Sequence, residues 1–413
     1  MERQDNMNDA LTTLYYKLRT LSVFQTKLYE EPLYSVMEFL SAASSGDPAA
    51  ALTQYSALAR TLYQSGGDLG LAMRALALNG SEDVYLDEVV SGDEPSEQTK
   101  AALDRDLRIL NEVASLTPAV LQSWIPADDF CDFGSLDLPV WENTLVDLAK
   151  DYADMIGTVG TRGYGIFRDY IMFQVIDGEV VPVADPSYKP LERFYGYRRE
   201  RAEVLRNTEV LANGGNASNV LLYGDAGTGK SSTVKASAAA FADRGLRLIE
   251  FNKSQAADIP GIAASLKRSP LKFIFYIDDL SFTDSDDNFY CIKGILEGNV
   301  TGQPSNIVIY ATSNRRHLVR ESMEDRQGDD IHLNDTLQEI MSVSARFGLL
   351  ITFQKPAKDL YLEIVKEMAE EYGVTYDDEA DFFRRAETFA IRANGRSPRT
   401  AKQFVTLASE GMR

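Results

Sequence analysis

The sequence of 413 residues predicts an α/β domain with a parallel, five-stranded sheet, together with a mainly helical N-terminal region and a C-terminal helical bundle. Two observations lead to this fold class. Short apolar runs alternate with helical segments between residues 219 and 353, whereas in the flanking regions the apolar residues mainly recur at the spacing of a helix. A glycine-rich turn follows the first apolar run, where a strand passes into a helix.

The five expected strands are near-continuous apolar runs, which is typical of strands buried on both faces of a parallel sheet. Helical segments between them favour a doubly wound order. The expected strands cover residues 219–223, 246–251, 271–277, 306–312 and 348–353.

Residues 1–160 are expected to form a helical domain. The stretch "TKAALDRDLRILNEVASL" places apolar side chains at spacings of three and four, on one stripe of a helix. These side chains are Leu103, Leu107, Leu110 and Ala114. The acidic stretch 81–97 is expected to be a solvated connection.

The remaining chain divides into three further segments. Residues 161–187 contain Asp177-Gly178 between apolar, β-branched residues, which predicts a β-hairpin that connects the helical domain with the core. The α/β core is expected at residues 188–355. A helical lid is expected at residues 356–413.

Composition narrows the classes of function. The formal net charge is −20, which disfavours a free-standing nucleic-acid binder, although a local basic patch stays open. The two cysteines have no disulfide or metal spacing. The N-terminus lacks a long apolar segment, and no run could span a membrane, so we expect a cytoplasmic protein that does not contact a membrane.

The turn "GDAGTGKS" fits the pattern G-x-x-x-x-G-K-[ST], in the strand–turn–helix setting that this pattern requires. Glycines let the backbone curl so that successive N–H groups face phosphate oxygens, and the following helix presents its positive end. Lys230 can reach the β- and γ-phosphates, and the Ser231 hydroxyl can ligate Mg²⁺. A structural turn with a surface lysine is the alternative. The expected nucleotide-binding residues of the turn are Gly224, Asp225, Ala226, Gly227, Thr228, Gly229, Lys230, Ser231 and Ser232.

Asp278 and Asp279 end the apolar run "KFIFYIDD", where a doubly wound sheet exposes its ligand-binding edge. Asp278 is expected to hold Mg²⁺, directly or through water, and Asp279 to orient the attacking water. The alternative is that both carboxylates cap the next element.

These motifs resemble those of the AAA+ ATPases, P-loop proteins with a helical lid. "GDAGTGKS" is similar to Walker A, "FIFYIDD" to Walker B, "IVIYATSN" to the sensor-1 strand, "SARFG" to an arginine-finger segment, and "GRSPRTAKQF" to sensor 2. More narrowly, the set resembles one bacterial AAA+ family catalogued as a domain of unknown function. The resemblance covers about residues 188–413.

The resemblance implies roles for further residues. Asn314 would be the sensor-1 residue, or alternatively a helix cap, and Arg346 would be the arginine finger, or alternatively an ordinary surface or ion-paired arginine. Arg399 is the better sensor-2 candidate and Arg396 the second. Arg315 and Arg316 are further candidates for contacts between subunits.

The segment before the first strand is where this superfamily packs the adenine. Tyr195, Gly196 and Tyr197 are therefore candidates for that pocket, with aromatic core packing as an equal alternative.

The resemblance implies an ATP hydrolase that uses ATP and Mg²⁺, forms homo-oligomers with ATP at subunit interfaces, and acts on an unidentified protein partner. Asp279 is one methylene shorter than the usual Glu, which puts fast hydrolysis in question. A slow ATP-dependent switch or loader, of the replication-initiator or helicase-loader type, is the alternative.

Overall fold

The protein divides into two compact units, Met1–Val159 with Gly163–Ile166, and Gly160–Arg162 with Phe167–Arg413. The structure is a computed structural model that describes residues 2–79, 83–127, 136–280, 296, 304–314, 346–393 and 395–410, with the side chains of 2–8 excepted. Each unit buries its own apolar side chains. Across these ranges, no helix is long and apolar enough to cross a bilayer.

The first unit is helical, as predicted. The expected stripe of Leu103, Leu107, Leu110 and Ala114 is buried, and Ser96 caps its helix by accepting a hydrogen bond from the Thr99 N–H. The helices are α1 (Glu2–Arg19), α2 (Leu33–Ser44), α3 (Pro48–Gln64), α4 (Leu69–Leu78), α5 (Val84–Val90), α6 (Glu97–Ala114), α7 (Pro118–Ser123) and α8 (Leu148–Arg162), with a short 3₁₀ helix η1 (Gln25–Tyr29).

Part of the acidic stretch expected to be a solvated connection is instead helix α5. The buried Asp83 side chain caps this helix by accepting hydrogen bonds from the backbone N–H groups of Tyr85 and Leu86, and Leu86 is buried. A short helix with one buried apolar residue has too weak a periodicity to be recognised in an acidic sequence.

The second unit contains a seven-stranded sheet in the order β2-β1-β4-β5-β6-β3-β7. The predicted parallel strands are present, but the prediction of five strands is wrong because the hairpin adds two. Strand β1 pairs with β4 in parallel and with β2 in antiparallel orientation, so the hairpin expected as a connector extends the sheet. The strands are β1 (Met172–Ile176), β2 (Glu179–Pro182), β3 (Val220–Gly224), β4 (Leu246–Phe251), β5 (Lys272–Ile277), β6 (Ile307–Asn314) and β7 (Leu349–Phe353).

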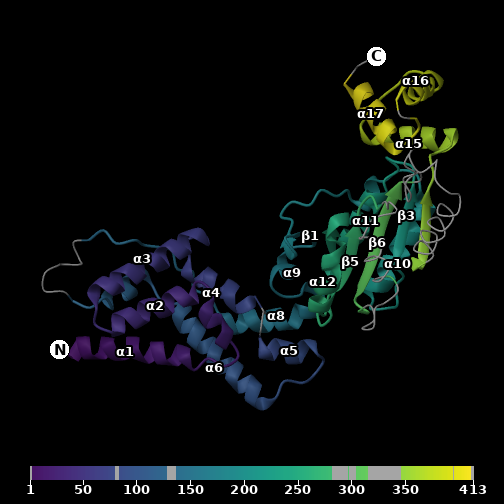
Figure 1. Cartoon of the computed structure of the whole chain (residues 1–413). Helices are drawn as coiled ribbons and strands as arrows, with labels where there is room; N and C mark the ends of the chain where they lie inside the picture. Colours follow the sequence, from purple (N-terminus) through teal and green to yellow (C-terminus); the bar gives the residue numbers. More distant parts are fainter. Residues whose placement is uncertain are drawn as a thin grey trace, which may run out of the picture. The chain divides into compact units, whose positions relative to one another are not determined.

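Helices cover both faces of this sheet (Figure 1). One face packs on α10 (Arg198–Ala212) and α11 (Lys230–Ala240), and the other on α12 (Ile259–Leu266). The alternation of side chains along each buried strand supplies both apolar cores, which explains the continuous apolar runs in the sequence. Short elements complete this part: α9 (Ile166–Asp169), η3 (Leu191–Arg193), η4 (Ala242–Arg244) and η5 (Lys253–Asp258).

The predicted C-terminal bundle is present as α15 (Lys358–Glu371), α16 (Glu379–Arg392) and α17 (Pro398–Ser409) (Figure 1). Ser397 caps α17 by accepting a hydrogen bond from the Thr400 N–H, and Pro398 occupies the first turn, where no N–H partner is needed. This cap places Arg399 in the first turn, next to the glycine-rich loop.

Candidate nucleotide-binding site

The predicted site residues meet where β3, β5 and β6 end at one edge of the sheet. Gly224 and Asn314, which end β3 and β6, are register partners. The carboxyl ends of parallel strands share one edge, so loops that follow them surround a common crevice. That crevice has a volume of about 460 Å³. Its lining consists of Ala226, Gly227, Gly229, Lys230, Ser231, Ser232, Asp278, Asp279, Thr312, Asn314 and Arg399.

Glycines shape the loop that enters this cavity. Gly224 has a φ of +144°, and a Cβ there would lie 2.1 Å from the Phe353 carbonyl oxygen, so only glycine lets β3 approach β7 this closely. Gly229 has a φ of +94° and immediately precedes α11, where no side chain caps the helix. The first turn of α11 therefore opens into the cavity with its positive end uncapped by a side chain.

Lys230 is buried beneath this loop. Its Nζ donates hydrogen bonds to the carbonyl oxygens of Gly224 (3.1 Å) and Asp225 (2.9 Å) and to Asn314 Oδ1 (3.2 Å). Burial lowers the pKa of the Lys230 ammonium, although nearby carboxylates oppose that change. A phosphate placed in the cavity would favour the ammonium and compensate the cost of its burial.

Asp278 is held by four hydrogen bonds to a single oxygen. Its Oδ1 accepts from Ser231 Oγ (2.8 Å), Tyr276 OH (2.6 Å), Thr312 Oγ1 (2.5 Å) and the Asp279 N–H (3.1 Å). Burial raises the pKa of Asp278, but these four donors outweigh burial and leave it below its ordinary value. Asp278 is therefore an ionised, fixed carboxylate, and none of the four bonds uses Oδ2.

Sequence reasoning missed Tyr276 and Thr312. The sequence did contain a signal for Tyr276. It precedes Asp278 by two residues, and side chains two apart in a strand point to the same face of the sheet. Thr312 belongs to the neighbouring strand β6, and only the pairing of β5 with β6 brings it to Asp278.

Asp279 and Asn314 also contact each other. Asn314 Nδ2 donates to Asp279 Oδ1 at 2.8 Å, and the Asp279 N–H donates to Thr312 Oγ1 at 3.0 Å. Asp279 has a φ of +50°, the left-handed region that few non-glycine residues occupy. Asn314 thus joins the ammonium of Lys230 to the carboxylate of Asp279, because its two amide atoms bond one group each.

The structure separates the two sensor-2 candidates. The Arg399 N–H donates to the Gly227 carbonyl oxygen at 3.4 Å, and Arg399 lines the cavity. The Arg396 guanidinium instead donates from Nε (3.0 Å) and Nη2 (2.7 Å) to Glu387 Oε1. Arg399 is therefore the arginine that the lid brings to the loop.

Arg346 does not join this cavity. Arg346 precedes β7, at the opposite end of the strand from the glycine-rich loop, and it is not among the lining residues. Arg315 and Arg316 lie outside the described residues.

The three candidates for the base pocket have different surroundings. Tyr195 lines a second cavity of about 330 Å³, which also borders the loop. Gly196 has a φ of +61°, and a Cβ there would meet Ile364 at 2.7 Å, so glycine lets the lid pack closely. Tyr197 is buried, and its OH donates to the Gln354 carbonyl oxygen at 2.6 Å.

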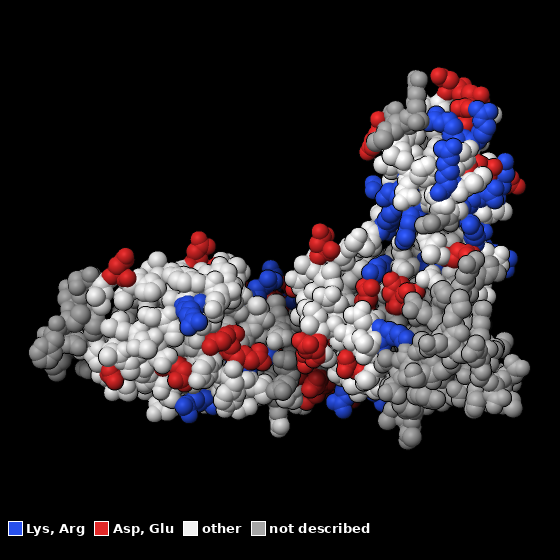
Figure 2. All heavy atoms as spheres, turned by 45° about the horizontal axis from the view of Figure 1, so that its top comes forward, with Lys and Arg blue, Asp and Glu red and all other residues white. Residues whose placement is uncertain are grey.

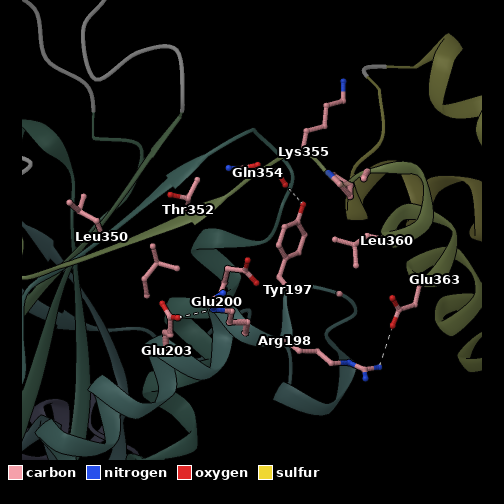
Figure 3. Close-up of a pocket in the computed structure, with 15 residues that line it drawn as sticks. Tyr197, Arg198, Glu200, Glu203, Leu350, Thr352, Gln354, Lys355, Leu360 and Glu363 are labelled. Carbon is pink, nitrogen blue, oxygen red and sulfur yellow. Dashed lines mark hydrogen bonds and ion pairs between the residues drawn. The ribbon is translucent and has the colours of Figure 1, made fainter.

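Tyr197 also borders the largest of the three cavities, with a volume of about 730 Å³ (Figure 3). This cavity lies along β7, α10 and the start of α15, away from Lys230. Its charged side chains are of both signs, and the ion pairs include Arg198 with Glu363. The Tyr197 ring also packs against Phe353, with ring centroids 5.4 Å apart.

The oxygen atoms available at the loop suit Mg²⁺. Ser231 and Asp278 supply a hydroxyl and a carboxylate within hydrogen-bonding distance of each other, and Mg²⁺ prefers such ligands while keeping waters and phosphate oxygens. In the part of the chain that the structure describes, no group of three or more His, Cys, Asp or Glu side chains could form an all-protein metal site.

A family model described as "Protein of unknown function (DUF815)" matches residues 169–411. No curated protein matches the chain.

Three solved structures illustrate its wider similarity. RuvB from Thermotoga maritima is 17% identical, with 54% of this chain and 72% of RuvB covered and a TM-score of 0.32. ORC1 from Aeropyrum pernix, solved in complex with DNA, is 16% identical, with coverages of 52% and 60% and a TM-score of 0.36. AMPPCP-bound DnaA from Aquifex aeolicus is 17% identical, with coverages of 54% and 64% and a TM-score of 0.36. The matched part spans less than two thirds of the ORC1 and DnaA chains.

Proposed function

The chain belongs to the DUF815 family of proteins of unknown function, and we propose that it binds Mg-ATP and hydrolyses it as an AAA+ type ATPase. The observation that carries the proposal is the convergence of Lys230, Asp278, Asp279 and Asn314 on one cavity beside an uncapped helix start. A glycine turn with a surface lysine would not bury the ammonium or surround it with these groups.

Each side chain has a role that its surroundings support. Lys230 exchanges its carbonyl partners for the β- and γ-phosphates of ATP and balances their charge. Asp279 orients the attacking water and accepts its hydrogen bond, while the Asn314 amide fixes the carboxylate. Arg399 approaches the phosphates from the lid. Mg²⁺, held by Ser231 and Asp278, would supply further charge neutralisation.

We propose that a neighbouring copy of the chain completes this site. Arg346 is far along β7 from its own loop, so it would serve as an arginine finger for the nucleotide of a neighbouring copy. Hydrolysis would then depend on homo-oligomer formation, and the helical first unit would pass the change to a protein partner. With a net charge of −20, the chain is not expected to require nucleic acid.

A slow switch or loader is the second candidate. The observation that favours it is that Asp279 Oδ1 already accepts a hydrogen bond from Asn314, which competes with the attacking water. Steady-state turnover with and without DNA separates the two candidates. Fast turnover that is independent of DNA supports the ATPase that acts on a protein partner, and slow turnover that DNA stimulates supports the loader.

The test of the main proposal is Lys230→Ala. We expect loss of measurable Mg-ATP binding and turnover, because the buried ammonium is the principal cation for the phosphates. Lys267→Ala is the matched control: it removes the same charge from an exposed position at the end of α12 and should retain both. Isothermal titration and phosphate release measure the outcome. A Lys230→Ala protein that binds and hydrolyses ATP normally would remove the proposal.

A further inference from the structure

The second cavity, which Tyr195 lines, contains more cationic side chains than a neutral base and a 5′-triphosphate would need. It has a volume of about 330 Å³, at the lower end of small-molecule pockets. It shares Gly227, Gly229, Ser232 and Arg399 with the cavity that holds Lys230, so one ligand can extend through both. Phe194, Tyr195 and Met368 supply its apolar walls.

Positive charge dominates this cavity. Among its described lining residues there is no Asp or Glu, whereas the other two cavities contain both signs. This excess is local, because the whole chain carries a net charge of −20. Figure 2 shows Lys and Arg side chains gathered over the region where the helical lid meets the core of the same unit. The five cationic lining residues are Lys189, Arg193, Arg201, Arg399 and Lys402.

Two of these cations are engaged by the protein. Arg201 is only 8% exposed and donates to the carbonyl oxygens of Phe194 and Tyr195, both at 3.3 Å. Arg193 pairs with Glu371 at 3.6 Å.

The other three, Lys189, Arg399 and Lys402, line the cavity from solvent-exposed positions. Within the described ranges, the side chains of Lys189, Arg399 and Lys402 make no ion pair. Burial lowers the pKa of Lys189, and repulsion from Lys402 and Arg193 lowers it further, against the attraction of Glu371. These like charges repel one another, and although water screens part of the repulsion at exposed positions, a bound anion would be attracted by all three.

We propose that this cavity binds a phosphate group carried on the sugar of the bound nucleotide, at its 2′ or 3′ position. The inference rests on the proposed function, since it takes the 5′-phosphates to lie at Lys230 in the neighbouring cavity. A neutral base cannot compensate Lys189 and Lys402, whereas a phosphate dianion accepts charge-assisted hydrogen bonds from both. The class of ligand is thus a nucleotide with phosphates at both ends of its sugar.

The test compares ADP with ADP that carries an additional 2′- or 3′-phosphate, by isothermal titration on the full chain. We expect one of the phosphorylated forms to bind at least about tenfold more tightly than ADP. The double variant Lys189→Ala/Lys402→Ala should reduce this ratio to within about twofold. The control Lys366→Ala removes a lid lysine that pairs with Glu379 outside the cavity, and should keep the ratio of the unmodified chain.

Three results would overturn the inference. The phosphorylated forms could bind no better than ADP, or the double variant could weaken all ligands by the same factor, which would assign the lysines to the 5′-phosphates. Inorganic phosphate added together with ADP could reproduce the gain, which would assign the cavity to a separate anion. If ADP and ATP themselves did not bind, the proposed function would fail instead, so the two failures are distinguishable.

Discussion

At the scale of single residues, the convergence of four donors on Asp278 Oδ1 makes Tyr276 a positioning residue. Its hydroxyl lies 2.6 Å from that oxygen, and Thr312 Oγ1 holds the same atom from the neighbouring strand. Donors of this kind fix the rotamer of a carboxylate and keep it ionised, which in metal sites strongly affects affinity.

We predict that Tyr276→Phe raises the Mg²⁺ concentration needed for half-maximal ATP turnover by about tenfold. Loss of the donor also raises the pKa of Asp278, so the acidic limb of the pH–activity profile should move to higher pH. Turnover measured against Mg²⁺ concentration and pH checks both effects.

Tyr310→Phe is the control for this prediction. Tyr310 is the register partner of Tyr276 on β6 and is equally buried, but its hydroxyl bonds to Thr208 and Asn207. Each variant should lose about 1 kcal/mol of stability through one lost hydroxyl. Only Tyr276→Phe should change the Mg²⁺ dependence, and identical Mg²⁺ curves for the two variants would contradict the positioning role.

At the scale of elements, the loop depends on how closely β3 approaches β7. Because the Phe353 carbonyl oxygen would lie 2.1 Å from a Cβ at position 224, the two strands must separate to accept a side chain. We predict that Gly224→Ala lowers the free energy of unfolding by more than about 3 kcal/mol and abolishes nucleotide binding.

Gly261→Ala serves as the counterpart in urea unfolding and nucleotide titration. Gly261 lies within α12, and a Cβ there would meet nothing within 4 Å. Alanine should therefore be neutral or stabilise the helix by up to about 1 kcal/mol. Equal free energies of unfolding for the two variants would show that stability does not depend on the close approach of β3 to β7.

The bounds of the strands could be predicted from neighbouring residues, whereas the place of the hairpin in the sheet could not. The five predicted parallel strands lie within two residues of the observed ones, because burial on both faces leaves a continuous apolar run. The hairpin was predicted from Asp177-Gly178 and is confirmed, but its addition to the sheet edge depends on contacts of β1 with β4, which a turn motif does not encode.

At the scale of the whole molecule, the proposed trans action of Arg346 gives the sharpest test of assembly. We predict that Arg346→Ala binds ATP with near-normal affinity but loses turnover. A mixture with Lys230→Ala, which keeps Arg346 but lacks a working loop, should recover part of the activity, since one copy supplies the finger and the other the site.

The matched control for this experiment is Arg268→Ala, an exposed arginine after α12, which should keep full turnover alone. Weakened ATP binding by Arg346→Ala, without loss of turnover at saturating ATP, would mean that the finger is assigned to the wrong residue. Failure of the mixture to recover activity would argue against the trans arrangement.

The strands, the glycine-rich loop and the acidic pair at the end of β5 could all be predicted from the amino-acid sequence alone. These features are encoded in short windows, where apolar runs, glycines and acidic side chains are adjacent along the chain. The resemblance added Asn314 and Arg399, and the structure brings both to the cavity.

The tertiary structure was needed to see that Arg399 lines the cavity while Arg396 bonds to Glu387. It was also needed to bring Tyr276 and Thr312 to one carboxylate oxygen, and Lys189 and Lys402 to the second cavity beside the loop. These groups come from segments far apart in the sequence, so the order of the strands and the packing of the lid set the distances between them. A linear pattern shows which side chains are available, whereas the fold decides which of them share a site.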